Sequence, residues 1–355
     1  MSTALFESFT LRGLTFAHRA WVSPMCQYSA VDGVPNAWHR AHYASFAIGR
    51  AGLVLSEATG VVPEGRISPQ DTGLWNDEQA RAWAPVVDFS HSQDVPFGFQ
   101  LAHAGRKAST FAPWLGGGSV PGAQGGWATS APSAPAFADY AAPRAMTKAD
   151  LVRTREAFAA AARRADSIGA DVVELHGAHG YLLHQFLSPL SNERDDEYGG
   201  SLDNRMRFPL EVVEAVRSAW PDHKPLLLRV SATDWVDGGW DVESTIALAR
   251  EAHARGVDLV DVSSAGLDPR QQIALGPGYQ VPFAARVRAE AGVATGAVGL
   301  ITEAAQAEEV VATGQADAVL LGRAMLRDPH WSLRAAHDLG ADVSWPVQYE
   351  RARFR

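Results

Sequence analysis

VVELHGAHGYLLHQFLSPLSNERDDEYGGSLDN, residues 172–204, begins with Val172–Leu175, a short run that is typical of a buried strand. Directly after it come His176 and His179, each followed by a glycine, and then Tyr181. Glycine lets the backbone turn tightly and lets another group approach it closely. Imidazole and phenol side chains supply hydrogen-bond donors. We therefore expect the functional chemistry of this protein at the end of this strand.

Two other interpretations of these histidines stay open. A single histidine near a strand end is usually an ordinary core or surface residue, but a cluster with a tyrosine and glycines is less easily explained in that way. The H-x2-H spacing also occurs in zinc sites, which need a third or fourth protein ligand. His184 is available, yet it lies in the apolar run Tyr181–Leu187 with no predicted orientation toward the other histidines. We expect no metal, and a metal-dependent barrel hydrolase is the alternative function.

Working outward from this stretch, eight short apolar runs alternate with helical patterns. Such alternation predicts a parallel sheet, and eight units of this spacing predict a closed (β/α)8 TIM barrel. An open, doubly wound sheet is the alternative, but no G-x-G-x-x-G follows the first strand. The expected strands are Trp21–Met25, Gly52–Ser56, Phe97–Leu101, Val172–Leu175, Leu226–Val230, Leu259–Val262, Ala294–Ala297 and Ala318–Leu321. The expected helices are Trp38–Arg50, Asp77–Ser92 with Asp77 as its N-cap, Thr147–Ile168, Asn204–Trp220, Val242–Arg255, Val281–Glu290 and Ile301–Thr313.

Three segments fall outside this alternation in what we expect to be a single domain, residues 1–355. Residues 1–20 alternate weakly and predict a hairpin that caps the barrel. Residues 105–145 form a Gly- and Pro-rich excursion after the third strand, with GGGSVPGAQGGW at its centre. So long an irregular stretch is either disordered or functional. Residues 345–355 form a C-terminal tail that ends in PVQYERARFR.

The composition disfavours several classes of protein. Of the 355 residues, 46% are hydrophobic and 20% are charged, which is ordinary for a protein with a large core. The formal net charge of −9 disfavours a nucleic-acid or anionic-membrane partner. No apolar run approaches the ~18 residues of a membrane span, and the N-terminus lacks the apolar centre of a signal peptide. The single cysteine, Cys26, permits no internal disulfide. We expect a cytoplasmic enzyme or binding protein.

The C-terminal ends of the strands carry the active site in barrels of this kind. Arg229 is the most informative residue there, because a guanidinium in the apolar run Leu226–Val230 is costly to bury unless it meets an anion or an acceptor. A structural ion pair with a carboxylate is the alternative explanation. Besides the histidines and tyrosine above, the predicted strand ends carry Cys26, Tyr28, Ala58, Gln100, Arg229, Ser263, Gly299, Gly322 and Arg323.

The last two strands point to a ligand with a phosphate group. Gly299 and Gly322 follow these strands, and barrels often bind phosphate there on backbone N–H groups. Arg323 would add a charge-assisted hydrogen bond. The lysines exclude another barrel chemistry: only Lys107, Lys148 and Lys224 exist, and none lies on a predicted strand, where a Schiff-base aldolase would need one.

At these residues the chain resembles the old yellow enzyme family of FMN-dependent ene-reductases, and in particular its short bacterial branch, which includes xenobiotic reductases. The resemblance covers nearly the whole chain and is weakest at residues 116–127. The motifs that carry it include SPMCQYSA (23–30), EATGVVPEGRIS (57–68), QLAHAGRKA (100–108), HGAHGYLLHQFLSP (176–189), TGAVGLIT (295–302), LLGRAMLRDP (320–329) and the terminal PVQYER.

The resemblance implies how a flavin would be held. FMN would lie across the barrel mouth with its phosphate on Gly299, Gly322 and Arg323. Arg229 would lie near N1 and O2 of the isoalloxazine and stabilise the anionic reduced flavin. Cys26 would lie near the flavin and tune its potential, although a small buried hydrophobic residue is the simpler explanation of this cysteine. The other implied cofactor-binding residues are Ser23, Pro24, Met25, Ala58 and Gln100.

The resemblance also implies the reaction. NADPH or NADH would reduce FMN, which would pass a hydride to the β carbon of an activated alkene such as an enone, a maleimide or a nitroalkene; nitro esters and quinones are further candidate substrates. His176 and His179 would hydrogen-bond the carbonyl oxygen, and Tyr181 would protonate the α carbon. Tyr28 and Lys107 would line the substrate pocket. A non-catalytic flavin redox sensor is an alternative to this enzyme.

By the same resemblance, Arg351 in the tail would enter the site of a neighbouring subunit. This implies self-association as a dimer or tetramer. The alternative is a solvated basic end, since the last five residues, RARFR, are mostly arginine.

Overall fold

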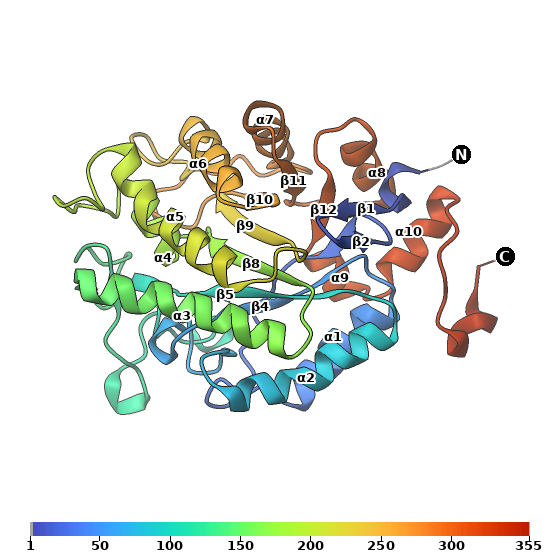
Figure 1. The fold of residues 1–355 in the computed structure, drawn as a ribbon, viewed down its shortest axis with the longest axis horizontal. Helices are drawn as coiled ribbons and strands as arrows, with labels where there is room; N and C mark the ends of the chain where they lie inside the picture. The colour runs from blue at the N-terminus through green and yellow to red at the C-terminus, as the bar shows by residue number, and fades with distance from the viewer. Residues whose placement is uncertain (1–2, 355) are drawn as a thin grey trace.

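The computed structural model describes residues 3–354, which form a closed barrel of eight parallel strands surrounded by helices (Figure 1). The strands are hydrogen-bonded in the order β10-β11-β12-β3-β4-β5-β8-β9. The predicted TIM barrel is therefore confirmed, and the open sheet is wrong. The strands are β3 (Ala20–Val22), β4 (Val54–Gly60), β5 (Phe97–Ala102), β8 (Val172–Gly177), β9 (Leu226–Ser231), β10 (Leu259–Ser263), β11 (Ala294–Ala297) and β12 (Ala318–Leu321).

The first barrel strand is shorter than predicted. β3 ends at Val22 and not at Met25, since Ser23 N still bonds the Leu321 carbonyl of β12 but Pro24 has no N–H to continue the ladder. Residues 23–29 therefore follow an irregular path. β4 is also irregular, with a register shift between Leu55 and Ala58 where it pairs with β5. The irregular backbone after β3 places Ser23–Tyr28 on the rim of the barrel, and the shift inside β4 sets the position of Ala58.

The helices agree with the predicted ones except at their ends, and two short helices, Leu182–Leu187 and Arg323–Arg327, were not predicted. Asn76, and not the predicted Asp77, is the N-cap of α2, because its extended backbone lets its side chain accept the Gln79 N–H while Asp77 is already helical. α8 begins later than predicted, at Ala304. The helices are α1 (Ala37–Ile48), α2 (Asp77–Ser92), α3 (Lys148–Ser167), α4 (Leu182–Leu187), α5 (Leu202–Ala219), α6 (Val242–Ala254), α7 (Val281–Ala291), α8 (Ala304–Ala312), α9 (Arg323–Arg327) and α10 (Trp331–Leu339).

The predicted N-terminal hairpin is confirmed, and it closes one end of the barrel. Strands β1 (Phe9–Leu11) and β2 (Leu14–Phe16) pair antiparallel. Leu11 and Phe16 pack against apolar side chains of six barrel strands; this cluster, the barrel floor, also contains Trp21, Leu53, Leu55, Val172, Leu227, Leu259, Ala318 and Leu320. The hairpin removes the apolar floor from water, so the opposite, C-terminal end is the open one.

Strand periodicity stacks a polar layer on this floor. Side chains two residues apart point to the same face of a strand. Leu227 belongs to the floor, so Arg229 and Ser231 of β9 also face inward. In the same way, Val172 is followed inward by Glu174 and His176, and Leu259 by Asp261 and Ser263. The barrel interior therefore changes from apolar to ionisable as it approaches its C-terminal end.

The excursion over residues 105–145 follows a defined path along the rim. It contains short 3-10 turns at Gly105–Lys107, Pro113–Leu115 and Gly122–Gln124, and the two-stranded pair β6 (Ser130–Ala131) and β7 (Arg144–Ala145). Trp127 from this segment donates to the Glu64 carbonyl and packs in a cluster with Cys26, Tyr28 and Tyr181. Part of the excursion therefore covers the barrel mouth.

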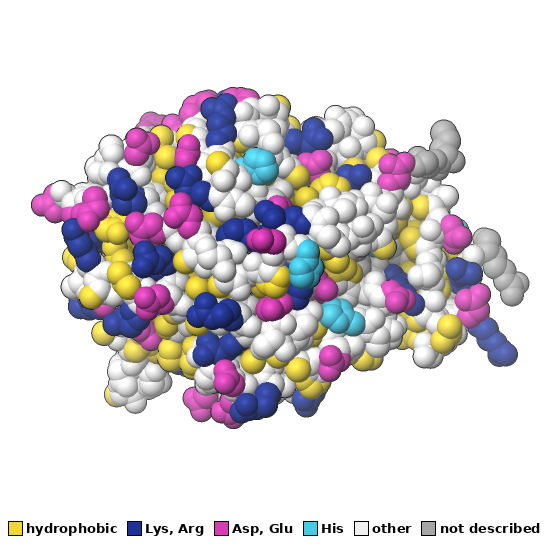
Figure 2. All heavy atoms as spheres, viewed as in Figure 1, with side chains coloured by type: hydrophobic (Ala, Val, Ile, Leu, Met, Phe, Trp, Pro, Cys, Tyr) yellow, Lys and Arg dark blue, Asp and Glu magenta, His cyan; other side chains and the backbone are white. Residues whose placement is uncertain are grey.

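The outer surface carries charges of both signs. Figure 2 shows lysine and arginine side chains interspersed with aspartate and glutamate on the face that it draws, without an extended area of either sign. Within residues 3–354, no helix is both long enough and apolar enough to cross a membrane.

Candidate active site

Three aromatic side chains converge at the end of β8. The His176 ring lies edge-on to the His179 ring, with centroids 5.2 Å apart, and edge-on to the Tyr181 ring at 4.9 Å. His176 ends the inward-facing row of β8, while His179 and Tyr181 come from the turn that follows. The sequence motif therefore brings its two histidines and its tyrosine into one small volume.

The turn after β8 depends on left-handed backbone. His179 has φ +58° and Gly180 has φ +72°. A Cβ atom on Gly180 would lie 2.2 Å from the Gly266 carbonyl oxygen, so only glycine fits at this approach to the loop after β10. The turn aims the rings on either side of Gly180 back toward the barrel axis.

The two histidines are neutral at ordinary pH. Burial, helped by the positive charge of Arg229, holds the pKa of both imidazoles well below their usual range. The Ala178 N–H donates to Nδ1 of His176 at 3.3 Å, so the neutral ring carries its proton on Nε2. Nε2 of His179 lies 2.8 Å from Ser263 Oγ. These rings can donate hydrogen bonds to a ligand without adding positive charge.

Tyr181 keeps its proton over a wide pH range. Burial, reinforced by the nearby Cys26 and Tyr28, raises the pKa of the phenol well above its ordinary value. Lys107 Nζ lies 5.3 Å from the centroid of the Tyr181 ring and donates to the carbonyls of His179 and Gly266 at 2.9 and 2.8 Å. Lys107 therefore joins the loops after β8 and β10 directly beside the phenol.

Arg229 contacts both a neutral hydrogen-bond acceptor and a carboxylate, the two kinds of partner considered in the sequence analysis. Its Nη1 donates to Ser23 Oγ at 3.0 Å, and its Nε lies 3.1 Å from Asp261 Oδ2 on the neighbouring strand β10. The ion pair that was the alternative explanation is thus present, and it sits in the polar layer below the three rings. Arg229 is 5% exposed, which places its charge at the bottom of the mouth.

A second buried carboxylate lies in this layer, and sequence reasoning missed both. Glu174 Oε1 accepts a hydrogen bond from Gln100 Nε2 at 2.8 Å. Burial first, and then the charge of Asp261, raises the pKa of Glu174 to about 8. Two carboxylates therefore share one guanidinium, and burial raises the pKa of both. Their signal in the sequence was an acidic residue inside each of the apolar runs VVELH and LVDVS.

This arrangement predicts a pH effect on stability in Glu174→Gln. Because the pKa of Glu174 rises from 4.5 to about 8 on folding, the folded protein binds more protons than the unfolded chain in this window. Stability from this group is therefore fully present below pH 4.5 and is lost as pH rises through about 8. The slope is at most about 1.4 kcal/mol per pH unit. Urea unfolding at several pH values measures the effect. The free energy of unfolding of the variant should rise relative to that of wild type as the pH increases. If the two proteins showed the same pH dependence of stability, the raised pKa of Glu174 would be wrong.

A cavity of about 240 Å³ opens at the ends of β10, β11 and β12, beside the side chains described above. Ser263, Gly299, Gly322 and Arg323 line it, as does Arg327, which sequence reasoning missed although it stands four residues after Arg323. A Cβ atom on Gly322 would meet only Met25 Sδ, at 3.6 Å, so the backbone there faces open space. Two arginines and accessible glycine backbone suit an anionic group such as a phosphate.

The ends of β3 and β4 complete the rim. Cys26, Tyr28 and Ala58 pack in one cluster with Tyr181 and Trp127. Burial raises the pKa of the Cys26 thiol and of the Tyr28 phenol, so both stay protonated. Ala58 lies in register with Gln100 across the β4–β5 pair. These residues therefore form a neutral side wall of the mouth, and the end of β3 adjoins the cavity, because β3 pairs with β12 and Met25 Sδ is the atom closest to a Cβ atom on Gly322.

Two residues considered in the sequence analysis, His184 and Arg351, lie away from the group of side chains at the barrel mouth. His184 turns away from the other histidines, and its Nε2 lies 2.9 Å from Asp234 Oδ1. Among the described residues, no three His, Cys, Asp or Glu side chains are arranged to hold a metal ion. Arg351 is exposed in the 3-10 turn Val347–Ala352, on the tail that Figure 1 shows beyond α10.

Fold and site together define the class of protein. It is a (β/α)8-barrel enzyme whose titratable and cationic side chains meet at the C-terminal ends of the strands, where such enzymes carry their active sites.

Comparison with known proteins identifies the family. The model of the NADH:flavin oxidoreductase / NADH oxidase family matches residues 4–342. An NADPH dehydrogenase from Geobacillus thermodenitrificans is 48% identical over 354 residues, which is 99% of this chain and 99% of that one. The chain belongs to the NADH:flavin oxidoreductase / NADH oxidase family, to which the old yellow enzymes are assigned, and it is an NAD(P)H:flavin oxidoreductase. The resemblance seen in the sequence is confirmed, and the metal-dependent hydrolase is wrong.

Solved structures agree with this assignment. Morphinone reductase in complex with tetrahydroNAD superposes with a TM-score of 0.78 at 28% identity, over 96% of this chain and 92% of that one. A complex of 2-naphthoyl-CoA reductase gives a TM-score of 0.85 at 23% identity and shows the shared fold alone. This superposition covers 95% of the present chain but only 52% of the reductase chain.

Proposed function

We propose that this protein is an NAD(P)H-dependent FMN ene-reductase that reduces activated alkenes. The observation that carries the proposal is the convergence of two neutral imidazoles and a protonated phenol above one buried guanidinium, next to an anion-binding cavity. The family supplies the flavin and the nicotinamide reductant in general terms. FMN, the alkene and the role of each side chain are our assignments.

The residues present fit FMN. The cavity beside β11 and β12 offers Gly299, Gly322 and Arg323 to its phosphate, with Arg327 as a second cation. Ser23, Pro24, Met25, Cys26, Ala58, Gln100 and Arg229 would hold the isoalloxazine. When bound, FMN would take a hydride from NADPH or NADH and deliver it to the β carbon of the alkene. Arg229 would stabilise negative charge on the reduced ring, since its guanidinium is buried and fixed by Ser23 and Asp261.

The histidines would bind the carbonyl or nitro oxygen of the substrate. Negative charge grows on this oxygen as the β carbon is reduced. His176 offers its Nε2–H. His179 offers Nδ1–H when the Ser263 hydroxyl donates to its Nε2, which lies 2.8 Å away. Because both rings are already neutral and held in place, they can stabilise this charge without reorganising.

Tyr181 would protonate the α carbon. Its raised pKa keeps the phenol protonated until an enolate develops beside it, and an enolate is basic enough to take the proton. Tyr28 and Lys107 would line the substrate pocket, where Lys107 also holds the loop that carries His179. The protonated thiol of Cys26 would lie against the flavin and tune its potential.

We further propose that Arg351 enters a neighbouring subunit's site. Its support is the exposure of its side chain, on a tail that extends beyond α10. Sedimentation of wild type and Arg351→Ala, together with the KM of the variant, tests the proposal. A monomeric wild type would contradict it.

Spectroscopy under anaerobic conditions tests the proposed function. The purified protein should carry the visible absorption of oxidised flavin and lose it on addition of NADPH or NADH. An enone, a maleimide or a nitroalkene should then restore the absorption without oxygen. If NADPH bleached the flavin and no member of this panel restored the absorption, the protein would be a redox sensor. A colourless protein that did not bind added FMN would contradict the proposal.

His176→Ala should weaken the binding of phenols to the oxidised enzyme. A phenolate oxygen resembles the enolate oxygen that His176 is proposed to hold, so the loss of one donor should cost about 10²- to 10³-fold in the alkene-reducing step and a smaller factor in phenol affinity. Titration with 4-hydroxybenzaldehyde, followed through the flavin spectrum, measures the affinity. An unchanged dissociation constant would exclude this role.

A further inference from the structure

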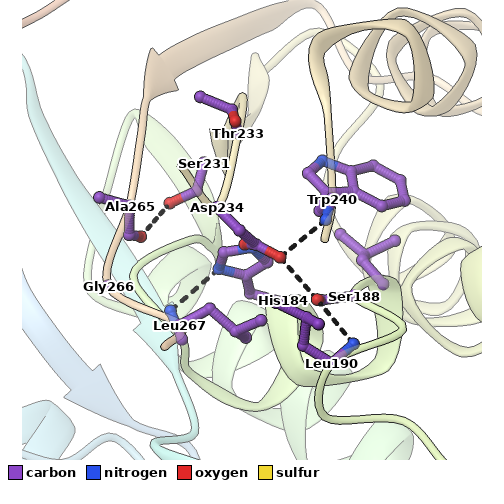
Figure 3. A network of polar contacts seen from close by, with 12 residues as sticks. His184, Ser188, Leu190, Ser231, Thr233, Asp234, Trp240, Ala265, Gly266 and Leu267 are labelled. Carbon is purple, nitrogen blue, oxygen red and sulfur yellow. Dashed lines mark hydrogen bonds and ion pairs between the residues drawn. The ribbon is translucent and has the colours of Figure 1, made fainter. Parts of the chain in front are cut away.

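A buried polar network, consisting of His184, Ser188 and Asp234, lies behind the turn that carries His179 and Tyr181. His184 Nε2 lies 2.9 Å from Asp234 Oδ1, and both side chains are fully buried. Asp234 Oδ2 accepts hydrogen bonds from Ser188 Oγ at 2.6 Å and from Trp240 N at 2.7 Å. Figure 3 shows these groups pointing toward one another from α4, the chain after it and the loop after β9.

The network has the residue types of a catalytic triad without its geometry. A serine nucleophile needs its hydroxyl on the imidazole, but the Ser188 hydroxyl donates to the carboxylate of Asp234. All three side chains are 0% exposed, so a substrate cannot reach them. The network can act only through what it holds in place.

What it holds is the backbone N–H of Gly180, the residue between His179 and Tyr181. The Gly180 N–H donates to Nδ1 of His184 at 2.9 Å, so the imidazole proton lies on Nε2 and faces Asp234. The neighbouring Gln185 donates from Nε2 to the Gly180 carbonyl at 2.7 Å. Helix α4 therefore binds both polar groups of Gly180, with Asp234 fixing the tautomer of the histidine that does so.

The turn needs such support because its backbone is strained. A non-glycine residue with positive φ costs about 1–3 kcal/mol and persists only where its surroundings impose it; His179 is such a residue, at φ +58°. Ser231 Oγ accepts the His179 N–H at 2.9 Å and Lys107 binds the His179 carbonyl at 2.9 Å. The adjoining Gly180 N–H is bound by the network alone.

We propose that His184 and Asp234 are positioning residues for alkene reduction, which hold the Gly180 peptide so that His179 and Tyr181 keep their places at the barrel mouth. This inference rests on the proposed function. Neither residue touches substrate or flavin. A displacement of about 1 Å at a reacting group is enough to cost about 10²-fold in rate.

Two substitutions at position 184 separate the two contacts of the imidazole. In His184→Asn, the amide oxygen takes the place of Nδ1 and can still accept the Gly180 N–H, while the contact with Asp234 is lost. In His184→Gln, the amide nitrogen takes the place of Nε2 and stays beside the Asp234 carboxylate, while the Gly180 N–H loses its acceptor. Both variants remain polar and neutral, so they differ mainly in which contact survives.

We expect His184→Gln to slow the re-oxidation of the reduced enzyme by an enone by about 10- to 100-fold and to weaken 4-hydroxybenzaldehyde binding. His184→Asn should stay much closer to wild type in both measurements. FMN content and the rate of flavin reduction by NADPH should change little in either variant. His91→Gln is the matched control, since His91 and Asp171 form a similar pair at 2.7 Å on the exposed surface.

Asp234→Asn gives a second test if His184→Gln does not fold. An amide at position 234 can keep its oxygen toward Ser188 and Trp240 only by turning its N–H2 toward Nε2 of His184, which favours the tautomer with the proton on Nδ1. A proton on Nδ1 would face the Gly180 N–H, so this hydrogen bond would be lost. We therefore expect the same loss in re-oxidation rate as in His184→Gln.

The outcomes separate this inference from the proposed function. The positioning role is wrong if wild type reduces alkenes and His184→Gln or Asp234→Asn matches it in rate and in phenol affinity. It is also wrong if His184→Asn and His184→Gln lose both properties equally, since general packing would explain that. If no alkene oxidises reduced wild type, the proposed function fails, and phenol affinity across the variants still tests the role of His184.

Discussion

Tyr181→Phe should slow re-oxidation of the reduced enzyme by an activated alkene by about 10²- to 10⁴-fold, the usual contribution of a general acid. The phenylalanine ring keeps the edge-on contact with His176, whose centroid lies 4.9 Å from that of Tyr181, so the site should keep its shape. The variant lacks only the hydroxyl that we propose supplies a proton to the α carbon. Reduction of the flavin by NADPH requires no such proton and should proceed at nearly the wild-type rate.

Rapid mixing of each half-reaction under anaerobic conditions measures the two rates separately. Tyr198→Phe is the control, because it removes a hydroxyl that bonds the Glu211 carboxylate at 3.3 Å on α5, away from the mouth. If Tyr181→Phe slowed both half-reactions equally, the phenol would be acting on flavin binding or on site geometry, and its role as proton donor would be wrong.

Arg229→Met should lower the free energy of unfolding by about 3–5 kcal/mol, as expected when one partner of a buried ion pair is removed. The substitution leaves the Asp261 carboxylate in the barrel interior without the guanidinium that now lies 3.1 Å from it. On the proposed placement of the flavin, it should also weaken flavin retention and lower the reduction potential of the remaining flavin, because the positive charge that we propose lies beside the ring would be gone.

A compensating change separates stability from electrostatics. Arg229→Met/Asp261→Asn removes the unpaired charge and should recover much of the lost stability, but it restores no cation and so should leave the flavin potential low. Urea unfolding and flavin redox titration measure the two effects. Arg288→Met is the control, since it breaks a surface ion pair with Asp317 at 3.0 Å that should contribute about 1 kcal/mol or less. A stable, fully flavinated Arg229→Met would contradict the assignment.

Sequence reasoning reached the fold because strands and helices in a barrel alternate along the chain. The eight apolar runs correspond to the eight strands, and the errors lie at ends, as at Val22 and Asn76. These ends depend on single hydrogen bonds, such as Asn76 to the Gln79 N–H, which periodicity does not report. The grouping of His176, His179 and Tyr181 was also predictable, since His176 stands near the end of one strand and the other two lie in the short turn after it.

The partners of buried charges were not predictable in this way. Arg229 was expected to meet an anion, but Asp261 lies on another strand and comes opposite it only through the β9–β10 register. His184 was weighed as a third metal ligand, whereas the loop after β9 brings Asp234 to its Nε2 and turns the ring away from the other histidines.

The sequence alone determined the order of the elements, the barrel, and the motif that assigns the family, because each depends on residues close together in the chain. Only the tertiary structure decided which groups hold protons and which side chains hold the strained turn in place. Burial and neighbouring charge set the pKa values of His176, Tyr181 and Glu174. Both causes arise only when chain segments that are far apart in sequence meet inside the barrel.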